Sequence, residues 1–153
     1  MDLILWRHAE AEDPHDGISD QERELTAKGK KQAKNMAEWL SAHLPEHARI
    51  LVSPAARTVQ TAEALERKFE VSRNLSTSAS ISDHLTASRW PVGDAVVLVG
   101  HQPTLGQFAA LLMSGHPHAW DIKKGAVWWL RSAPQGSSAY ATLRTAISPG
   151  MLE

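Results

Sequence analysis

Three short runs of consecutive apolar residues predict buried strands. They cover residues 3–6, 50–52 and 95–99. A strand that is covered on both faces has a continuous apolar run, and this is typical of a parallel sheet packed between helices. In the segments between these runs, apolar residues recur at spacings of three and four, which indicates amphipathic helices. The pattern therefore predicts an α/β fold with a mostly parallel central sheet.

The helical spacing is clearest in three places. Thr26 is a good N-cap for a first helix, which Pro45 ends. Residues 53–54 are Ser-Pro, so a second helix is expected to begin there, with a capping hydroxyl before a proline, and to continue to Phe69. A third helix is expected to begin at Pro103. The apolar face of the first helix consists of Ala33, Met36, Ala37, Leu40 and Leu44.

A hairpin is predicted near the end of the chain. Residues 125–131 and 139–147 have strand-like composition, and residues 134–138 between them favour a turn. We expect an antiparallel hairpin at the edge of the sheet. Because adjacent side chains of a strand point to opposite faces, Trp128 and Trp129 should lie on different sides of the sheet.

Two segments carry weaker patterns. Residues 71–91 are rich in Ser, Thr and Asn, and we expect a short strand near Leu75 and a helical turn over residues 83–89. The tail, residues 148–153, is expected to fray. The first of these segments is too short for an inserted subdomain, and the length of 153 residues suits one domain, so residues 1–153 are expected to form a single domain.

Composition narrows the function classes. Sixteen basic residues face seventeen acidic ones, so neither nucleic acid nor an anionic membrane is an expected partner. The absence of cysteine excludes disulfides, thiolate catalysis and zinc sites built from cysteine. The first strand begins at once, and no apolar run approaches the ~20 residues of a membrane span, so we expect a cytoplasmic protein, favoured as a monomer.

Charged and ionisable residues follow the predicted strands directly. Arg7 and His8 end the first strand, Arg57 lies in the first turn of the helix after the second, and His101 follows Gly100 at the end of the third. Right-handed crossovers bring the carboxyl ends of parallel strands to one edge of the sheet. A histidine that is neutral near pH 7 is a nucleophile, and arginine binds phosphate, so a phosphoryl group is the expected substrate.

Each of these residues also has an ordinary interpretation. Arg7 and His8 could be solvated charges at a strand end, and Arg57 could be a surface arginine paired with Glu63 or an aspartate. The histidines at 116 and 118 could contribute to a metal site, but no third ligand has suitable spacing, and an exposed turn is the simpler interpretation. No cofactor is expected.

The order of these motifs resembles the histidine phosphatase superfamily, and in particular its SixA-type phosphohistidine phosphatases. The resemblance implies a phosphoglycerate mutase-like, three-layer α/β/α fold, with His8 as the phosphorylated nucleophile and Arg7, Arg57 and His101 in the phosphate pocket. Ala9 stands where the family usually has glycine, and its methyl group could crowd the pocket. The matching stretches are residues 5–10, 25–33, 52–62 and 99–103.

Such a pocket stabilises phosphoryl charge without requiring a metal ion. The resemblance also implies that Arg23, which precedes Leu-Thr, reaches the phosphate, although a surface ion pair is the alternative. Asp83 and Glu10 are the candidate general acids, with a helix-capping role as the alternative for Asp83. An imidazole leaving group, whose ordinary pKa is about 6.5, needs less help from an acid than an alkoxide does, which favours phosphohistidine in a protein as the substrate. A small phosphorylated metabolite, or a phosphate-binding module without turnover, remains open.

Overall fold

A computed structural model describes residues 1–153 and contains one six-stranded sheet. The strand order is β3-β2-β4-β1-β5-β6, in which the first four strands are parallel and β5 and β6 form an antiparallel hairpin at the edge. This confirms the predicted sheet. The strands are β1 (Asp2–Arg7), β2 (Arg49–Val52), β3 (Glu70–Val71), β4 (Ala95–Gly100), β5 (Val127–Ser132) and β6 (Ala141–Ile147).

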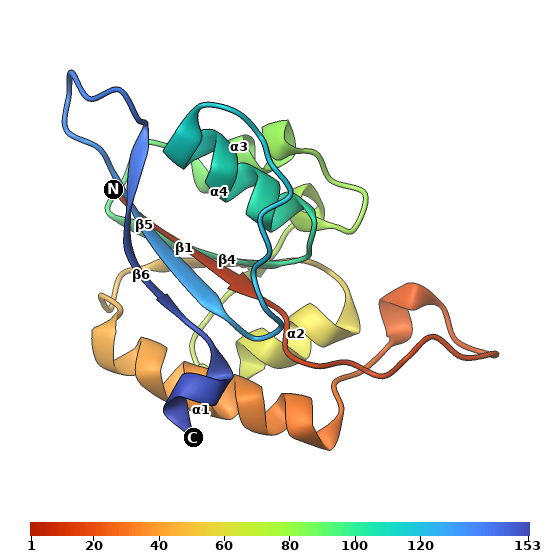
Figure 1. The fold of residues 1–153 in the computed structure, drawn as a ribbon. Coiled ribbons are helices and arrows are strands. Elements are labelled where there is room, and N and C mark those ends of the chain that lie inside the picture. Colours follow the sequence, from red (N-terminus) through yellow and green to blue (C-terminus); the bar gives the residue numbers. More distant parts are fainter.

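Four α-helices cover the two faces of the sheet and complete three layers, as Figure 1 shows. One face carries α1 (Ala27–His43) and α2 (Ala56–Glu63), and the other carries α3 (Ile81–Ser88) and α4 (Thr104–Ser114). Three short 3-10 helices, at Asp20–Glu22, Arg73–Leu75 and Pro149–Leu152, lie in the connections and at the end of the chain. None of the helices is long and apolar enough to cross a membrane.

The core follows from the alternation of side chains along the strands. In β1, Leu3 and Leu5 pack under α3 and α4, whereas Ile4 and Trp6 pack under α1 and α2. The hairpin obeys the same rule: Trp129 is buried on the α1 side, and the half-buried Trp128 packs against the cluster on the other side. The prediction that the two tryptophans separate is therefore confirmed.

The first predicted helix is confirmed, and the second is shorter than predicted. Thr26 caps α1 by accepting a hydrogen bond from the backbone N–H of Gly29. The second helix begins at Ala56 with Ala55 as its N-cap, and no side chain caps it, because the hydroxyl of Ser53 is bonded to another side chain instead. The helix ends at Glu63 rather than Phe69, and Glu66 soon afterwards has a positive φ of 54°, which a helix cannot continue through.

Two other expectations are wrong. Leu75 lies in a 3-10 helix instead of a strand, since its fully buried side chain fills the core beneath α3, and the strand of this segment, β3, lies earlier. The helical turn expected after it is present as α3. The C-terminal tail is ordered: residues 149–152 form a 3-10 helix against α1, with Pro149 buried and Leu152 packed on the core.

Candidate active site

The register of β1 and β4 brings the two predicted histidines together. Arg7 pairs with Gly100 in the parallel ladder, so the next residue of each strand, His8 and His101, leaves the sheet at the same level. The backbone N–H of His8 donates to the carbonyl of Gly100 (3.1 Å), and the centres of the two imidazole rings are 5.4 Å apart. Two histidines that are distant in sequence thus lie side by side at the carboxyl ends of two central strands.

His8 has one ring nitrogen engaged and one free. Its Nδ1 lies 2.7 Å from the carbonyl oxygen of Ala9, so a neutral ring carries its proton on Nδ1 and keeps a lone pair on Nε2. Burial lowers the pKa of His8 to about 4; the hydrogen bond to Ala9 opposes this shift, and the positive charges of Arg57, Arg7 and Arg23 add to it. The ring is therefore neutral, and nucleophilic at Nε2, near pH 7.

His101 is held by a serine. Its Nε2 lies 2.7 Å from Oγ of Ser53, and both side chains are buried. The backbone N–H of Ala55 donates a long hydrogen bond (3.5 Å) to the same hydroxyl oxygen, which leaves the hydroxyl hydrogen for His101. When Nε2 accepts that hydrogen, a neutral ring carries its proton on Nδ1, and this atom is buried with no partner. The pKa of His101 is lowered to about 3. Burial is the largest cause, and the nearby His8 and Arg57 act in the same direction.

Both predicted arginines are anchored by their outer nitrogens. Nη1 of Arg7 donates to the carbonyl of Ile122 (2.8 Å). Arg57 is 3% exposed and donates to Asp20 twice, from Nη1 to the carbonyl (2.7 Å) and from Nη2 to Oδ2 (3.0 Å). The Nε atoms of Arg7 and Arg57 remain buried without a hydrogen-bond partner. Buried donors are almost always paired, so these two, with Nδ1 of His101, mark a place for an acceptor.

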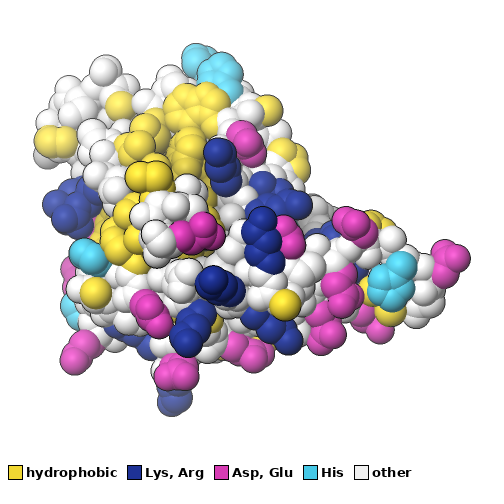
Figure 2. All heavy atoms as spheres, turned by 60° about the horizontal axis from the view of Figure 1, so that its bottom comes forward, with side chains coloured by type: hydrophobic (Ala, Val, Ile, Leu, Met, Phe, Trp, Pro, Cys, Tyr) yellow, Lys and Arg dark blue, Asp and Glu magenta, His cyan; other side chains and the backbone are white.

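One pocket of about 220 Å³ unites these groups. The four residues predicted as the site all line it. Arg57 is buried rather than at the surface, although the ion pair with an aspartate in the alternative interpretation does form, with Asp20. The loop of residues 9–24 projects beside the sheet in Figure 1, and Figure 2 shows Asp, Glu and His side chains at the tip of a projection with Lys and Arg at its base. The lining residues are Arg7, His8, Ala11, Asp13, Arg23, Arg57, Thr77, His101, Gln102 and Lys124.

Of the three remaining candidates, only Arg23 reaches the pocket. Its Nε and Nη2 bond to Oδ1 of Asp20 (3.0 and 2.8 Å), so Asp20 joins Arg23 to Arg57. Arg23 and Arg57 lower the pKa of Asp20, with the Arg23 hydrogen bond as the largest cause, and the carboxylate stays ionised. Both the pocket position and the ion pair expected for Arg23 therefore occur.

The two candidate acids lie outside the pocket. Asp83 caps α3, where its Oδ2 accepts from the backbone N–H of Ser80 (2.8 Å), and this hydrogen bond lowers its pKa. The carboxylate of Glu10 accepts from the hydroxyl of Thr26 (2.9 Å) and lies 3.9 Å from Lys28. Because Asp83 is bonded at the start of α3 and Glu10 at the start of α1, and neither lines the pocket, neither is placed to donate a proton there.

Ala9 does not crowd the pocket. Its side chain is fully buried in a small apolar cluster with Leu25 and Ala33, and its φ is not positive. A glycine is needed at position 29 of the facing helix, because a Cβ there would lie 1.9 Å from the carbonyl oxygen of Glu10. The loop after His8 is thus packed directly on the first turn of α1.

The sequence analysis did not identify Ser53, which contacts His101, or several residues that line the pocket. Ser53 has the pattern of a helix cap, although its position next to the buried end of β2 was a signal for the site. Asp13, Thr77 and Lys124 come from three irregular segments that no periodic pattern places. The exposed histidines 116 and 118 lie in a loop, and no group of three potential metal ligands forms there.

Comparison with known proteins shows the family to which the chain is similar. A family model described as the histidine phosphatase superfamily (branch 1) matches residues 3–85. A phosphohistidine phosphatase SixA homolog from Haemophilus influenzae is 33% identical over 161 residues, covering 88% of this chain and 97% of the relative. Phosphohistidine phosphatase SixA from Escherichia coli is 31% identical over 132 residues, covering 75% and 76%.

A solved structure, of the protein histidine phosphatase SixA complexed with tungstate, is similar over the full length of both chains. The TM-score is 0.80 and the sequence identity 26%, with 100% of each chain covered. The three-layer α/β/α fold is that of the phosphoglycerate mutase-like phosphatases, as expected from the sequence.

Proposed function

Because the chain belongs to the histidine phosphatase superfamily, we propose that it hydrolyses phosphohistidine carried by a protein, with His8 as the nucleophile. One observation carries the proposal: three residues that line the pocket beside His8 each keep a buried donor without a partner, which are Nε of Arg7, Nε of Arg57 and Nδ1 of His101. Such donors suit the equatorial oxygens of a phosphoryl group in transfer.

The reaction proceeds in two steps. The lone pair on Nε2 of His8 attacks phosphorus, the new N–P bond forms as the substrate's P–N bond breaks, and the substrate imidazole leaves. It leaves as a neutral ring when its other nitrogen carries a proton. Water then attacks the phosphorus of phospho-His8, which releases inorganic phosphate and restores the neutral imidazole. The Ala9 carbonyl keeps Nδ1 protonated and orients the ring in both steps.

In this proposal Ser53 is a positioning residue. Its hydroxyl bonds Nε2 of His101, and this keeps the donor hydrogen on Nδ1, facing the phosphoryl oxygens, while the ring stays neutral. Arg57 is positioned in the same manner by Asp20. Because these hydrogen bonds already fix the donors, the donors need not move during the reaction. Donors that are fixed in advance stabilise a transition state best.

The acid requirement favours phosphohistidine over an alkyl phosphate. An imidazole leaving group needs little protonation, and the carboxylates of Glu10 and Asp83 are engaged elsewhere. Asp13 is the one carboxylate that lines the pocket, and it lies on the exposed loop. The similarity to phosphohistidine phosphatases at 31–33% identity supports the same substrate class.

A small phosphorylated metabolite is the second candidate, favoured by the polar wall that Asp13, Thr77 and Lys124 give the pocket. These side chains could contact the hydroxyl groups of a sugar or nucleotide phosphate. A phosphate-binding module without turnover, the third possibility, makes no use of the free Nε2 of His8. We also propose that residues 1–153 act as one catalytic domain.

A substrate panel ranks these candidates. The purified protein is incubated with a histidine-phosphorylated protein domain and, separately, with sugar phosphates, nucleotide phosphates and an aryl phosphate, and phosphate release is followed. We expect kcat/KM to be highest for the phosphoprotein. A higher value for one metabolite would replace the proposed substrate, and no release from any compound, including the aryl phosphate, would favour the binding module.

A further inference from the structure

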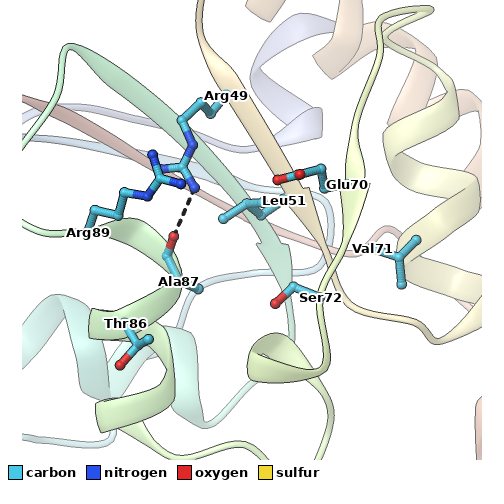
Figure 3. A pocket seen from close by; sticks show the side chains of 8 residues that line it. All are labelled: Arg49, Leu51, Glu70, Val71, Ser72, Thr86, Ala87 and Arg89. Atoms are coloured by element: carbon cyan, nitrogen blue, oxygen red, sulfur yellow. Dashed lines mark hydrogen bonds between the residues drawn. The ribbon is translucent and has the colours of Figure 1, made fainter.

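A second pocket, of about 460 Å³, lies away from the catalytic one and is about twice its volume. It opens beside the first residue of β2, the edge strand β3 and the end of α3, as Figure 3 shows. Arg49 begins β2 and Ser53 directly follows its other end, so about 13 Å of strand separates these two residues. The lining residues Val71 and Ser72 pair with Val52, at the end of β2 nearer Ser53. The lining residues are Arg49, Leu51, Glu70, Val71, Ser72, Thr86, Ala87 and Arg89.

Two arginines meet in this pocket without a counter-ion. In Figure 3 the guanidinium groups of Arg49 and Arg89 approach one another from opposite elements. Burial lowers the pKa of Arg49, and the positive charge of Arg89 lowers it further, which places the two charges within electrostatic range. Neither forms a salt bridge, and Glu70, the acidic residue of the lining, is not within ion-pair distance of them.

The end of α3 explains only one of the two cations. A helix C-terminus favours a positive charge, and Nη2 of Arg49 already donates to the carbonyl of Ala87 (3.2 Å). The side chain of Arg89 makes no hydrogen bond, and its backbone ends the helix in the left-handed conformation (φ 58°) that glycine adopts more easily. Closing the helix therefore does not call for an arginine at position 89.

The rest of the lining describes the ligand. Leu51 and Ala87 provide the apolar part of the lining, and Ser72 and Thr86 provide hydroxyl groups. Guanidinium groups bind carboxylates and phosphates through paired N–H donors, and two of them together favour an anion. The volume leaves room for more than the anionic group, and the apolar part of the lining suits a small apolar body attached to it.

We propose that this pocket is a second anion site, which binds a small organic phosphate or carboxylate between Arg49 and Arg89, with an apolar body on Leu51 and Ala87. Glu70 borders the site and opposes anion binding. The site has no histidine among its lining residues to accept a phosphoryl group, and the proposed role is binding without phosphoryl transfer.

Nuclear magnetic resonance of the arginine Nε–Hε groups tests this proposal on the whole protein. The probes are inorganic phosphate, phenylphosphonate and benzoate, which separate the anionic group from the apolar body and phosphate from carboxylate. We expect saturable shifts of Arg49 and Arg89, with tighter binding of phenylphosphonate or benzoate than of inorganic phosphate. Shifts confined to Arg7 and Arg57, or shifts that never saturate, would overturn the proposal.

Opposite charge changes make the test specific. Arg89→Gln should weaken binding at Arg49 on the order of tenfold or more, as expected when one of two charge-assisted partners is lost. Glu70→Gln should strengthen binding several-fold, because it removes a negative charge that repels the anion. Arg73→Gln removes an exposed arginine outside the lining and serves as the matched control. If Arg89→Gln and Arg73→Gln bound the probe with equal affinity, the site would be excluded. Neither substitution is expected to change phosphatase activity.

Discussion

The protein has two arginine-lined pockets, one at the carboxyl ends of β1 and β4 and one beside β2 and β3, and they differ in how the cations are held. In the catalytic pocket, Arg7 and Arg57 are fixed through their outer nitrogens, and each keeps a buried, unpaired Nε beside His8. In the second pocket, Arg89 is exposed and its side chain is unbonded, and no histidine is present. Paired arginines indicate an anion in both places, but only buried, anchored donors around a free nitrogen indicate chemistry.

Burial explains why the same residue type does different work in the two pockets. Charges interact more strongly where water is excluded, and donors that are already fixed lose nothing when the transition state forms. Arg57 meets both conditions, whereas the guanidinium of Arg89 faces solvent, where its interactions are screened. The following substitutions test this difference, from the largest effect to the smallest.

The largest contrast is between Arg57 and Arg49. Arg57→Ala should lower turnover on the order of 10²-fold or more, comparable to the loss of one preorganised donor of a transition state. Arg49→Ala, which removes a guanidinium group from the second pocket, should leave turnover within about twofold. Steady-state kinetics with an aryl phosphate measures both, and equal rates for the two variants would place Arg57 outside the catalytic pocket.

Ser53 should have an intermediate effect. Ser53→Ala leaves Nε2 of His101 without its partner, and the ring can then move its proton from Nδ1 to Nε2 and lose the donor that faces the phosphoryl group. We expect a loss of kcat on the order of tenfold, smaller than the loss of a donor itself. Ser53→Thr keeps the hydroxyl and should recover most of the rate.

A purely structural role for Ser53 would give a different result. Both variants would then lose thermal stability to a similar extent, and kcat per folded molecule would not change. Imidazole nitrogen chemical shifts of His101 report the tautomer directly. An unchanged tautomer in Ser53→Ala would contradict the positioning role.

The pH dependence separates the catalytic histidine from an ordinary one. Since the pKa of His8 is lowered to about 4, the neutral nucleophile persists as pH falls from 7 to 5.5, a range in which an ordinary histidine would become protonated. After correction for the substrate's own ionisation, kcat/KM should stay level over this range. Arg23→Gln removes one cause of the low pKa and should move the acidic limb to higher pH.

The same pKa shifts affect stability. His8 and His101 have folded-state pKa values below their ordinary value, so the unfolded chain binds more protons below pH 6.5. Stability is fully present above about pH 6.5 and is lost as the pH falls toward the folded-state values of about 4 and 3. Chemical denaturation at a series of pH values measures this loss, and a flat profile between pH 7 and 5 would contradict the buried, neutral histidines.

The smallest effect on turnover is expected for Asp83. Asp83→Ala removes half of the capping box of α3 and should lower the stability slightly, while the rate changes by less than about twofold. The melting temperature and the rate with an aryl phosphate measure the two effects. A large loss of rate at unchanged stability would restore Asp83 as a general acid.

The sequence predicted the parts of the site that follow the strands. Arg7, His8 and His101 come directly after buried apolar runs, and parallel strands bring such ends to one edge of a sheet. Arg57 was found because a cation is unexpected in the first turn of a helix. These inferences depend on local patterns and on one general rule of topology.

The remaining features depend on tertiary contacts. Ser53 before a proline has the sequence of a helix cap, and only the packing of β2 beside β4 shows that its hydroxyl faces His101. Asp20 belongs to a polar loop, and its bond to Arg57 joins residues 37 positions apart. The partnership of Arg49 with Arg89 likewise depends on how α3 ends against the sheet.

The central claim, that Nε2 of His8 receives the phosphoryl group, is tested most directly by rapid quench with a labelled substrate. Wild-type protein and His8→Ala are mixed with the substrate, quenched within the first turnover, and examined for label on the protein. We predict acid-labile, base-stable label on the wild type and none on His8→Ala. Equal labelling of the variant, or turnover by a wild type that never carries label, would contradict the account.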